Sequence, residues 1–306
     1  MKTCLVVGAS GWLGGRVVET LSSDGNIRVV ATWHRRAPAA PPRANIRVVS
    51  LDITDADAVA ELMAAVRPQM VIHAAAAISA STTANSVAEM TNANLIGTAN
   101  LVGSSRDLGV QRFVFCSSVG VYGEESPPNG FVESSPTLAS TPYGMSKLAG
   151  ELLLSEAVRA SGMEGVALRL GGIHGSGRDA GVIAGFSRQA IGNETLRVAS
   201  PQSVFNFLFI EDAVRAVELA AKGPTCRPYA SYNVAGDTPM SVEDLARTIV
   251  RKTCSSSEVV VADPRLLKYR VLDTGCFHRE MGFVPRRFDQ ALDVYLDSLQ
   301  AQRADR

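Results

Sequence analysis

Short apolar runs, rich in β-branched residues, alternate with stretches of helical spacing through the first half of the chain. Six of these runs predict strands, at residues 3–7, 29–32, 46–50, 70–73, 112–116 and 166–170. Helical windows lie among them, at residues 14–22, 55–66, 88–108 and 143–161. Strands that are apolar along their whole length are buried on both faces, and strands that alternate with helices run parallel. The pattern predicts an α/β fold with a doubly wound parallel sheet.

The alternation weakens after about residue 170. A glycine-rich stretch at residues 171–181 predicts a loop. A helix is expected beyond it at residues 210–222, because acidic side chains at its start suit the positive end of a helix. Another helix is expected to begin after Ser241, a suitable N-cap residue, and a last one to run from about residue 288 to 299.

The composition excludes several classes of protein. Hydrophobic residues make up 46% of the 306 residues, which is enough for a substantial core, and the formal net charge is zero. Proteins that bind nucleic acids or membrane surfaces carry a basic excess, so neither partner is expected. No apolar run is long enough to span a bilayer. The five cysteines form no C-x-x-C pair, which predicts reduced thiols in the cytoplasm rather than disulfides or a zinc site.

A glycine triplet follows the first predicted strand, in the segment Gly8-Ala-Ser-Gly11-Trp-Leu-Gly14. Glycine allows a tight turn and a close approach of the backbone to a ligand, and the helix N-terminus beyond it presents free N–H groups to a pyrophosphate. The spacing is G-x-x-G-x-x-G, and its place between a strand and a helix predicts dinucleotide binding. The alternative is a purely structural turn. The predicted site also includes three residues between the glycines: Ser10, Trp12 and Leu13.

The end of the second predicted strand is where the adenosine ribose is expected. An acidic residue there accepts hydrogen bonds from the ribose hydroxyls of NAD, whereas arginine suits the 2′-phosphate of NADP. Residues 32–36 include Arg35 and Arg36 but no carboxylate, so NADP(H) is the preferred cofactor and NAD(H) the alternative. A solvated loop is the other interpretation of the two arginines. Asp52 and Ile53 are expected near the adenine, although Asp52 also suits a helix cap.

Tyr143 and Lys147 stand four residues apart, on one face of a predicted helix. A phenol is a poor acid or base at neutral pH, and a neighbouring ammonium favours the phenolate and lowers the pKa of the phenol. Ser118 ends the fifth predicted strand, at the edge of the sheet where sites form in open α/β folds. The three residues predict a catalytic set, in which Lys147 also holds the nicotinamide ribose. A surface Tyr–Lys pair and a strand-end serine are the alternative.

With these motifs the chain resembles the extended short-chain dehydrogenase/reductase family, also called the NAD-dependent epimerase/dehydratase family. The motifs that carry the resemblance follow in order: the glycine turn, His73-Ala-Ala-Ala, Asn94-Leu-Ile-Gly97-Thr98, Ser117-Ser118-Val-Gly-Val-Tyr122-Gly123, Pro142-Tyr143-x-x-x-Lys147, Leu168-Arg169 leading to Gly175, and Ile210-Glu-Asp212. The resemblance implies hydride transfer between a nicotinamide and a carbinol or carbonyl carbon, with Tyr143 as the acid/base and Ser118 and Lys147 assisting. It adds four residues to the expected cofactor site: Ala74, Ala75, Asn94 and Ile173.

The resemblance also implies how the chain is organised. A Rossmann domain is expected at residues 1–170, with residues 205–222 packing back onto it. Residues 171–306 are expected to form a smaller C-terminal α+β region that mainly binds the substrate. Members of the family often form homodimers through two long helices. Apolar residues near Lys147 suit such an interface, although packing against the sheet explains some of them: Leu148, Leu152, Leu153 and Leu154.

Several positions depart from the pattern of family members that act on sugar nucleotides. Dehydratases of the family have a Thr-Asp-Glu segment at the position of Ser118, where the acidic pair supplies the acid and base for loss of water. This chain has Val119 and Gly120 at those two positions, which argues against dehydration. Gly172 and Phe205 replace an asparagine and an arginine that hold substrate phosphate in such members. Four arginines are candidates to compensate: Arg178, Arg188, Arg197 and Arg265. Three phenylalanines suit an apolar wall or the core: Phe186, Phe205 and Phe207.

The four histidines are scattered and have no metal-ligand spacing, so no metal site is expected. His73, at a strand end, is expected to be a packed structural residue. His174 lies near the expected mouth of the substrate site and is a candidate for contact with the substrate.

Three hypotheses of function follow. The leading one is an NADP(H)-dependent oxidoreductase that reduces a ketone or aldehyde, or oxidises the alcohol, so that its partner is a small carbonyl or alcohol compound. The alternative is a nucleotide-sugar 4-epimerase or 4-ketoreductase of the same family. The third is a non-catalytic protein that senses a dinucleotide. The intact set of Ser118, Tyr143 and Lys147 argues against the third, because a sensor has no need of a proton-transfer group.

Overall fold

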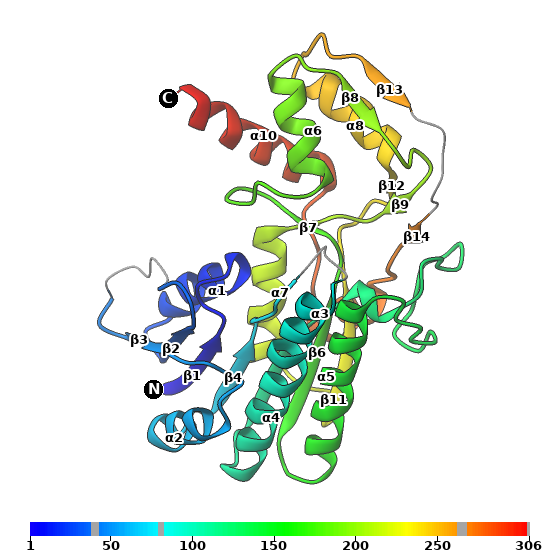
Figure 1. The fold of residues 1–306 in the computed structure, drawn as a ribbon. Coiled ribbons are helices and arrows are strands. Elements are labelled where there is room, and N and C mark those ends of the chain that lie inside the picture. The colour runs from blue at the N-terminus through cyan, green and yellow to red at the C-terminus, as the bar shows by residue number, and fades with distance from the viewer. Residues whose placement is uncertain (38–42, 79–82, 262–267, 305–306) are drawn as a thin grey trace.

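The central feature of the computed structural model is a seven-stranded parallel sheet (Figure 1). The model describes residues 1–37, 43–78, 83–261 and 268–304. From one edge to the other the strands are β3 (Ile46–Ser50), β2 (Ile27–Trp33), β1 (Lys2–Val7), β4 (Met70–His73), β5 (Arg112–Ser118), β6 (Glu164–Leu170) and β11 (Tyr229–Val234). Every neighbouring pair is parallel. The predicted Rossmann-type doubly wound sheet is confirmed.

Helices cover both faces of the sheet because its strands alternate between two apolar layers. On β1, Cys4 and Val6 pack into one core cluster, and Leu5 and Val7 pack into the other. The first cluster holds the apolar sides of α1 (Trp12–Ser22) and α7 (Ile210–Lys222). The second holds those of α2 (Ala56–Val66), α4 (Gly97–Asp107) and α5 (Pro142–Arg159). A sheet that is buried on both faces requires the uninterrupted apolar strands that the sequence contains.

The helix expected at residues 88–108 is broken into three pieces. The chain forms α3 (Ala84–Thr91), a π-helical turn η1 (Asn92–Ile96) and then α4. The side chain of Asn94 is buried within this turn and bonds both backbone groups of Ala77. A π-helical turn is wider than an α-helical one, so it changes the direction of a side chain without ending the helix. Such turns are frequent at functional sites. The turn depends on a contact with a distant segment, so helical periodicity alone does not reveal it.

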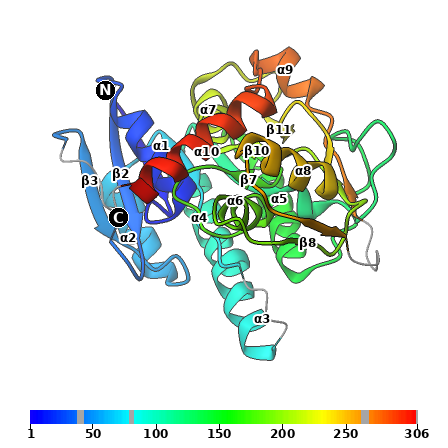
Figure 2. The same ribbon diagram turned by 90° about the horizontal axis from the view of Figure 1, so that it is seen from above.

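The C-terminal part of the chain forms a second, smaller group of elements beyond the carboxyl ends of the strands (Figure 1). Its helices are α6 (Val182–Ile191), α8 (Val242–Lys252) and α10 (Phe288–Ala304). Short strand pairs join them: β8 (Leu196–Val198) with β13 (Val259–Val261), and β9 (Val204–Phe205) with β12 (Met240–Ser241) and β14 (Tyr269–Arg270). Helix α9 (Gly275–Met281) instead packs against β11 of the main sheet, where Phe277 contacts Tyr232. Seen from above, α6, α8 and α10 lie over the core of the sheet unit, while α3 projects from the side (Figure 2).

Two further segments correct the expectations from the sequence. The glycine-rich stretch at residues 171–181 is not entirely loop, because β7 (Ile173–His174) pairs there with β10 (Leu208–Phe209). The strand β11 was not expected, because its sequence mixes polar and apolar residues and carries no clear periodicity. Its Tyr232 and Asn233 are buried through partners from other segments. Together, α7 and β11 return the chain to the sheet after the first C-terminal elements.

No helix in the described residues combines the length and the apolar composition that crossing a membrane requires. In the same part of the chain, no group of three or more histidine, cysteine, aspartate or glutamate residues could hold a metal ion.

Candidate active site

A cavity of about 630 Å³ lies between the carboxyl ends of the strands and the C-terminal elements. Its walls come from the glycine turn, the ends of β4 to β6, the start of α5, and segments after β6. Most of the residues predicted for catalysis and cofactor binding meet there: Gly11, Trp12, Leu13, Gly14, Ala74, Ser118, Tyr143, Lys147 and Ile173. The topology therefore brings these residues from five segments of the sequence to one edge of the sheet.

The glycine turn forms a backbone cradle that side chains would fill. Gly8 has a φ of +89°, and a Cβ atom there would lie 2.6 Å from the backbone of Ala75. A Cβ atom on Gly14 would lie 2.2 Å from the Gly8 carbonyl oxygen. Helix α1 begins after Gly11 with no side-chain cap and no acidic residue in its first turn. Its N–H groups are therefore free of side-chain partners at this end, which fits the diphosphate of a dinucleotide.

Two close contacts set the position of Ser118 relative to Tyr143. Tyr143 lies in the first turn of α5, whose N-terminus is capped by Thr141, because the Thr141 hydroxyl accepts a 3.1 Å bond from the Gly144 amide. A Cβ atom on Gly144 would lie 2.1 Å from the Gly120 carbonyl oxygen, so only glycine lets α5 approach the turn after β5 this closely. That turn is held by the Gly120 amide, which donates a 3.0 Å bond to Ser118 Oγ.

Lys147 is buried directly behind Tyr143. Its ammonium donates a 2.8 Å bond to the Cys116 carbonyl oxygen at the end of β5. The Nζ atom lies 5.8 Å from the centre of the Tyr143 ring and 4.8 Å from that of Phe115. The predicted pair therefore shares one face of α5, and the backbone of β5 holds the lysine in place.

The protonation of this pair differs from the expectation. Burial raises the pKa of Tyr143 to about 12, although a hydrogen bond with Ser118 and the charge of Arg178 oppose the rise. Burial also lowers the pKa of Lys147 to about 8. The prediction that the ammonium makes the phenol more acidic is wrong for this cleft, because desolvation penalises the phenolate more strongly. At neutral pH Tyr143 is protonated and is ready to donate.

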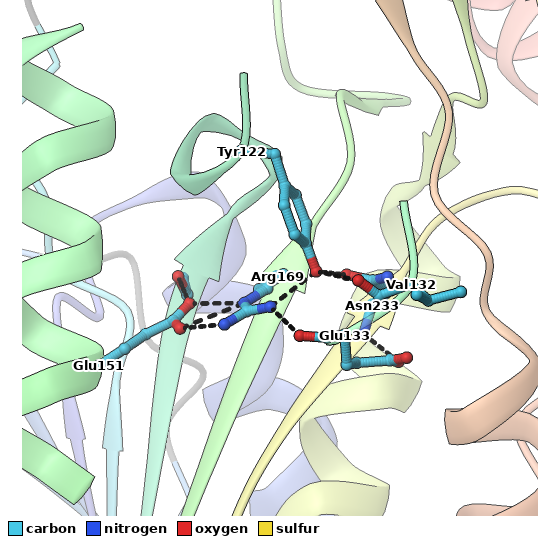
Figure 3. Close-up of polar contacts among 7 residues, drawn as sticks. Tyr122, Val132, Glu133, Glu151, Arg169 and Asn233 are labelled. Carbon is cyan, nitrogen blue, oxygen red and sulfur yellow. Dashed lines mark hydrogen bonds and ion pairs between the residues drawn. The ribbon is translucent and has the colours of Figure 1, made fainter. Parts of the chain in front are cut away.

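A buried polar network holds α5 in register with the sheet (Figure 3). Arg169 on β6 and Glu151 on α5 form an ion pair at 2.7 Å, with side chains 7% and 3% exposed. Arg169 also donates to the Tyr122 hydroxyl at 2.7 Å and to the Glu133 carbonyl oxygen at 2.9 Å. The Tyr122 hydroxyl in turn donates to Asn233 Oδ1 at 2.8 Å. The network therefore links α5, which carries Tyr143, to β6, β11 and the loop after β5.

Several predicted cofactor residues lie outside the cavity lining. Arg35 and Arg36 are exposed beyond the end of β2, and Ser10 is exposed in the glycine turn. Four others contact neighbouring segments instead: Gly8 approaches Ala75, Ile53 lies against Gly97, and Asn94 accepts from the Ala77 amide. A Cβ atom on Gly97 would strike the Ile53 side chain, so Ile53 lies against the start of α4.

Asp52 is not the helix cap that the sequence allowed. The α2 cap is Asp55, whose carboxylate accepts from the Ala58 amide at 3.0 Å. The Asp52 carboxylate accepts from both the amide and the hydroxyl of Thr54, and these bonds hold its pKa below the usual range. Its Oδ2 atom also lies 3.5 Å from His34 Nδ1. A carboxylate from β3 therefore sits beside the end of β2, where the sequence of β2 itself offers none.

The structure shows which of the candidate arginines and phenylalanines line the cavity. Arg178 lines the cavity, whereas Arg188 and Arg197 do not, and Arg265 lies outside the described residues. Gly172, Phe205 and Phe207 also line the cavity. Phe186 is instead part of the core on the inner side of α6. Arg178 lies over the ring of Trp12 in the glycine turn, and Phe205 and Phe207 add apolar surface to the cavity lining.

The two inward histidines are buried and neutral. His73 Nε2 lies 2.9 Å from the Thr98 hydroxyl, and burial lowers the pKa of His73 to about 3. His174 lines the cavity among the rings of Phe209, Phe288 and Tyr295. Burial lowers the pKa of His174 to about 4. His73 is the packed residue that the sequence predicts, and contact of His174 with substrate stays a prediction.

Replacing His174 with phenylalanine should make the protein less sensitive to acid. The pKa of His174 is about 4 in the fold, against the ordinary value of 6.5, so the unfolded chain binds the proton more readily. The free energy of unfolding therefore falls as the pH drops from 6.5 toward 4, by about 2 kcal/mol at pH 5 from this one group. Urea denaturation at pH 7 and pH 5 measures the effect. An equal loss in the wild type and His174→Phe would contradict the prediction.

Sequence reasoning missed the far wall of the cavity. Tyr295 on α10, Val242 on α8 and residues 182–184 at the start of α6 line it. These residues lack a motif, and their helices are separated by long stretches of sequence. The only signal was the glycine-rich stretch before α6, which predicts a change of direction but no contact.

Together, the dinucleotide cradle and the Ser–Tyr–Lys set in one cavity define an oxidoreductase of the Rossmann class. The model of the NAD dependent epimerase/dehydratase family matches residues 4–235. This chain belongs to that family. The UDP-glucose 4-epimerase of Mycolicibacterium smegmatis is 28% identical over 299 residues, which cover 94% of each chain.

Solved structures share the fold of this chain. The UDP-glucose 4-epimerase of Thermotoga maritima, solved with UDP-glucose, has a TM-score of 0.87 and 23% identity, covering 98% of this chain and 99% of that one. The UDP-glucose 4-epimerase of Thermus thermophilus, solved with NAD, has a TM-score of 0.82 and 25% identity, covering 97% and 99%. Because the chain belongs to the NAD dependent epimerase/dehydratase family, it is an enzyme of the oxidoreductase type, and the hypothesis of a non-catalytic sensor is not supported.

Proposed function

We propose that this enzyme is an NAD(H)-dependent 4-epimerase of a sugar nucleotide. The observation that carries the proposal is that one cavity joins the glycine cradle to Ser118, Tyr143 and Lys147. A relative that aligns over 94% of this chain is a UDP-glucose 4-epimerase. The alternative drawn from the sequence is therefore better supported than simple ketone reduction with NADP(H).

Each residue of the set has a distinct task in this proposal. A bound nicotinamide supplies the acceptor and donor of the hydride. In this proposal Tyr143 acts as its phenolate during oxidation, a form that the positive charges of Lys147 and of an oxidised nicotinamide would favour. The phenolate oxygen takes the proton of the sugar hydroxyl and returns it during reduction. Ser118 Oγ accepts from the Gly120 amide, and its O–H, which faces the Tyr143 hydroxyl, would also donate to the substrate oxygen. The ammonium of Lys147, fixed by the Cys116 carbonyl, stabilises negative charge that develops on the phenol.

Dehydration is not part of the proposal. The positions that would need an acid and a base are Val119 and Gly120, in the short 3₁₀ turn after β5. Neither side chain transfers protons. The proposed reaction therefore ends with the same atoms in the substrate and one inverted carbon.

The test is to incubate the protein with UDP-glucose or UDP-galactose and to follow both the sugar and the cofactor. The expected result is that proton NMR shows interconversion of the two sugars while the near-ultraviolet absorbance of the reduced cofactor shows no net change. Consumption of cofactor in proportion to product would contradict epimerisation and would favour net reduction.

Net reduction of a ketone or aldehyde is the second candidate function. Gly172 and Phe205, together with Phe207, give the cavity an apolar wall on the side away from the glycine turn. An uncharged carbonyl compound would suit that wall. A panel of ketones and aldehydes with NADH and NADPH distinguishes this candidate from the first.

NAD(H) should protect the protein against thermal unfolding more than NADP(H) does. The relative from Thermus thermophilus is solved with NAD, and here the Asp52 carboxylate stands beside His34 at the end of β2, where it would repel a 2′-phosphate. Saturating ligand at a hundred times its Kd adds about 2.7 kcal/mol to the unfolding free energy. A thermal-shift series with the four nucleotides measures the difference. A larger shift with NADPH that is lost on replacing Arg35 and Arg36 with alanine would reverse the assignment.

We also propose a homodimer that uses the exposed faces of α4 and α5, which lie side by side (Figure 1). Leu154 is fully buried and packs inward, but Leu152 is 62% exposed on α5. Light scattering should give the mass of two chains, and Leu152→Asp should give that of one. The matched control is Leu138→Asp in the loop before α5, where the leucine is 68% exposed. A wild type with the mass of one chain would contradict the proposal.

The organisation and location of the chain complete the proposal. We infer that residues 171–306 mainly bind the substrate, while residues 1–170, onto which residues 205–222 pack back, bind the cofactor. We infer a cytoplasmic location from the five cysteines, all of which are free thiols. Cell fractionation tests the location.

A further inference from the structure

The charges that line the cavity have one sign. Of the described residues that line it, only Lys147 and Arg178 carry a full charge at neutral pH, and no aspartate or glutamate is among them. The Lys147 ammonium already donates a hydrogen bond to the Cys116 carbonyl oxygen, at the end of the cavity where Tyr143 lies. The field inside the cavity therefore favours an anionic group, and the charge away from Lys147 comes from Arg178.

The guanidinium of Arg178 is unused by the protein itself. It forms no hydrogen bond or ion pair with the described residues, and its carbon lies 5.5 Å from the centre of the Trp12 ring. The neighbouring arginines are engaged. Arg16 donates to the Ser176 carbonyl oxygen at 2.8 Å, and Arg188 donates to that of Asp179 at 2.6 Å. Arg178 therefore presents a planar fork of donors to the cavity, which is suited to bidentate contact with phosphate oxygens.

The segment that carries Arg178 is fastened on three sides. The Ser176 carbonyl oxygen accepts 2.8 Å bonds from both Trp12 and Arg16 of α1. The Ser176 hydroxyl lies 2.6 Å from that of Ser298 on α10. On the other side of Arg178, Asp179 is held by Arg188 of α6. These contacts fix the loop between the sheet unit and the C-terminal elements, so the guanidinium is held at the cavity and does not swing freely in solvent.

We propose that Arg178 binds the diphosphate of the sugar-nucleotide substrate. This inference rests on the proposed function. The cofactor's diphosphate has its own donors in the uncapped first turn of α1. Arg178 stands beside that turn, 5.5 Å from the centre of the Trp12 ring, and lines the same cavity as Tyr143. It would supply the phosphate contact that Gly172 and Phe205 do not offer from their side of the cavity.

The test is calorimetric titration of the NAD-loaded enzyme with UDP, using the wild type, Arg178→Gln and Arg178→Lys. Loss of the guanidinium should weaken UDP binding by about tenfold to a hundredfold, as for a hydrogen-bonded charge, and lysine should restore part of it. The affinity of Arg178→Gln for NAD should stay within about twofold of the wild-type value. The substitution should weaken the binding of UMP less than that of UDP, because UMP has one phosphate fewer. Arg197→Gln is the matched control, because Arg197 is exposed on β8 and does not line the cavity. Thermal melts establish that each variant is folded.

The outcomes separate this inference from the proposed function. Equal UDP affinity in the wild type and Arg178→Gln overturns the inference, even if the wild type interconverts UDP-sugars. Loss of NAD affinity with unchanged UDP affinity also overturns it, because the guanidinium then serves the cofactor. A wild type that binds no UDP overturns it as well. Arg178-dependent binding of UDP without any interconversion of UDP-sugars would leave the inference standing and defeat the proposed epimerisation.

Discussion

Replacing Tyr143 with phenylalanine should lower kcat by about 10²- to 10⁴-fold, the range attributed to a positioned acid or base. The change removes one oxygen atom, which hydrogen-bonds with Ser118, and leaves the ring in place beside Lys147. The glycine cradle is untouched, so thermal shifts with NAD(H) should match those of the wild type. Steady-state kinetics together with cofactor binding measure the two quantities separately.

The matched control for this variant is Tyr269→Phe. Tyr269 lies on β14 and does not line the cavity, so its variant should keep wild-type kcat. A Tyr143→Phe protein with kcat within about threefold of wild type would remove the phenol from the chemistry, because a lost general acid or base has a far larger effect. Another group near Ser118 and Lys147 would then have to transfer the proton.

Replacing Arg169 with methionine should lower the free energy of unfolding by about 3–5 kcal/mol, because a buried carboxylate would lose its partner. Burial by itself would lower the pKa of Arg169, but the hydrogen bonds and charge of Glu151 outweigh burial and raise it. The variant leaves Glu151, 3% exposed, facing an apolar side chain, although Ser117 still donates to it. Urea denaturation measures the loss, and activity should fall as well because α5 carries Tyr143.

An exposed pair provides the comparison. Arg247 and Glu243 on α8 form an ion pair at 2.8 Å, with side chains 57% and 33% exposed. Arg247→Met should change the free energy of unfolding by less than about 1 kcal/mol, because solvent screens such pairs. Adding Glu151→Leu to Arg169→Met should recover much of the loss, since no unpaired charge remains. A loss below about 1 kcal/mol for Arg169→Met alone would mean that solvent reaches the Glu151 carboxylate in the folded protein.

Local pattern determined a large part of the fold. Six of the seven strands of the main sheet appear as apolar runs, because a strand that is buried on both faces must be apolar at every position. The glycine turn and the Tyr143–Lys147 spacing are also local, since one turn or one helix face contains all their geometry. These features fixed the class of the enzyme and its central residues before any contact was known.

Long-range contacts decided the remainder of the fold. In β11, Tyr232 and Asn233 are hydrogen-bonded to residues of other segments. Because these polar residues interrupt the apolar pattern, the sequence does not predict the strand. The π-helical turn at Asn94 depends on Ala77 in the same way. A side chain whose partner lies far along the chain leaves no periodic signal near itself.

By itself, the sequence determined the parallel sheet, the dinucleotide cradle and the identity of Ser118, Tyr143 and Lys147. Only the tertiary structure decided that Tyr143 is protonated, because burial depends on everything packed around it. It also placed Arg178, and neither Arg188 nor Arg197, in the cavity lining, and it placed Asp52 beside the end of β2. The physical reason is that backbone propensities act over a few neighbouring residues, whereas solvation and charge act over whatever the fold brings within a few ångströms.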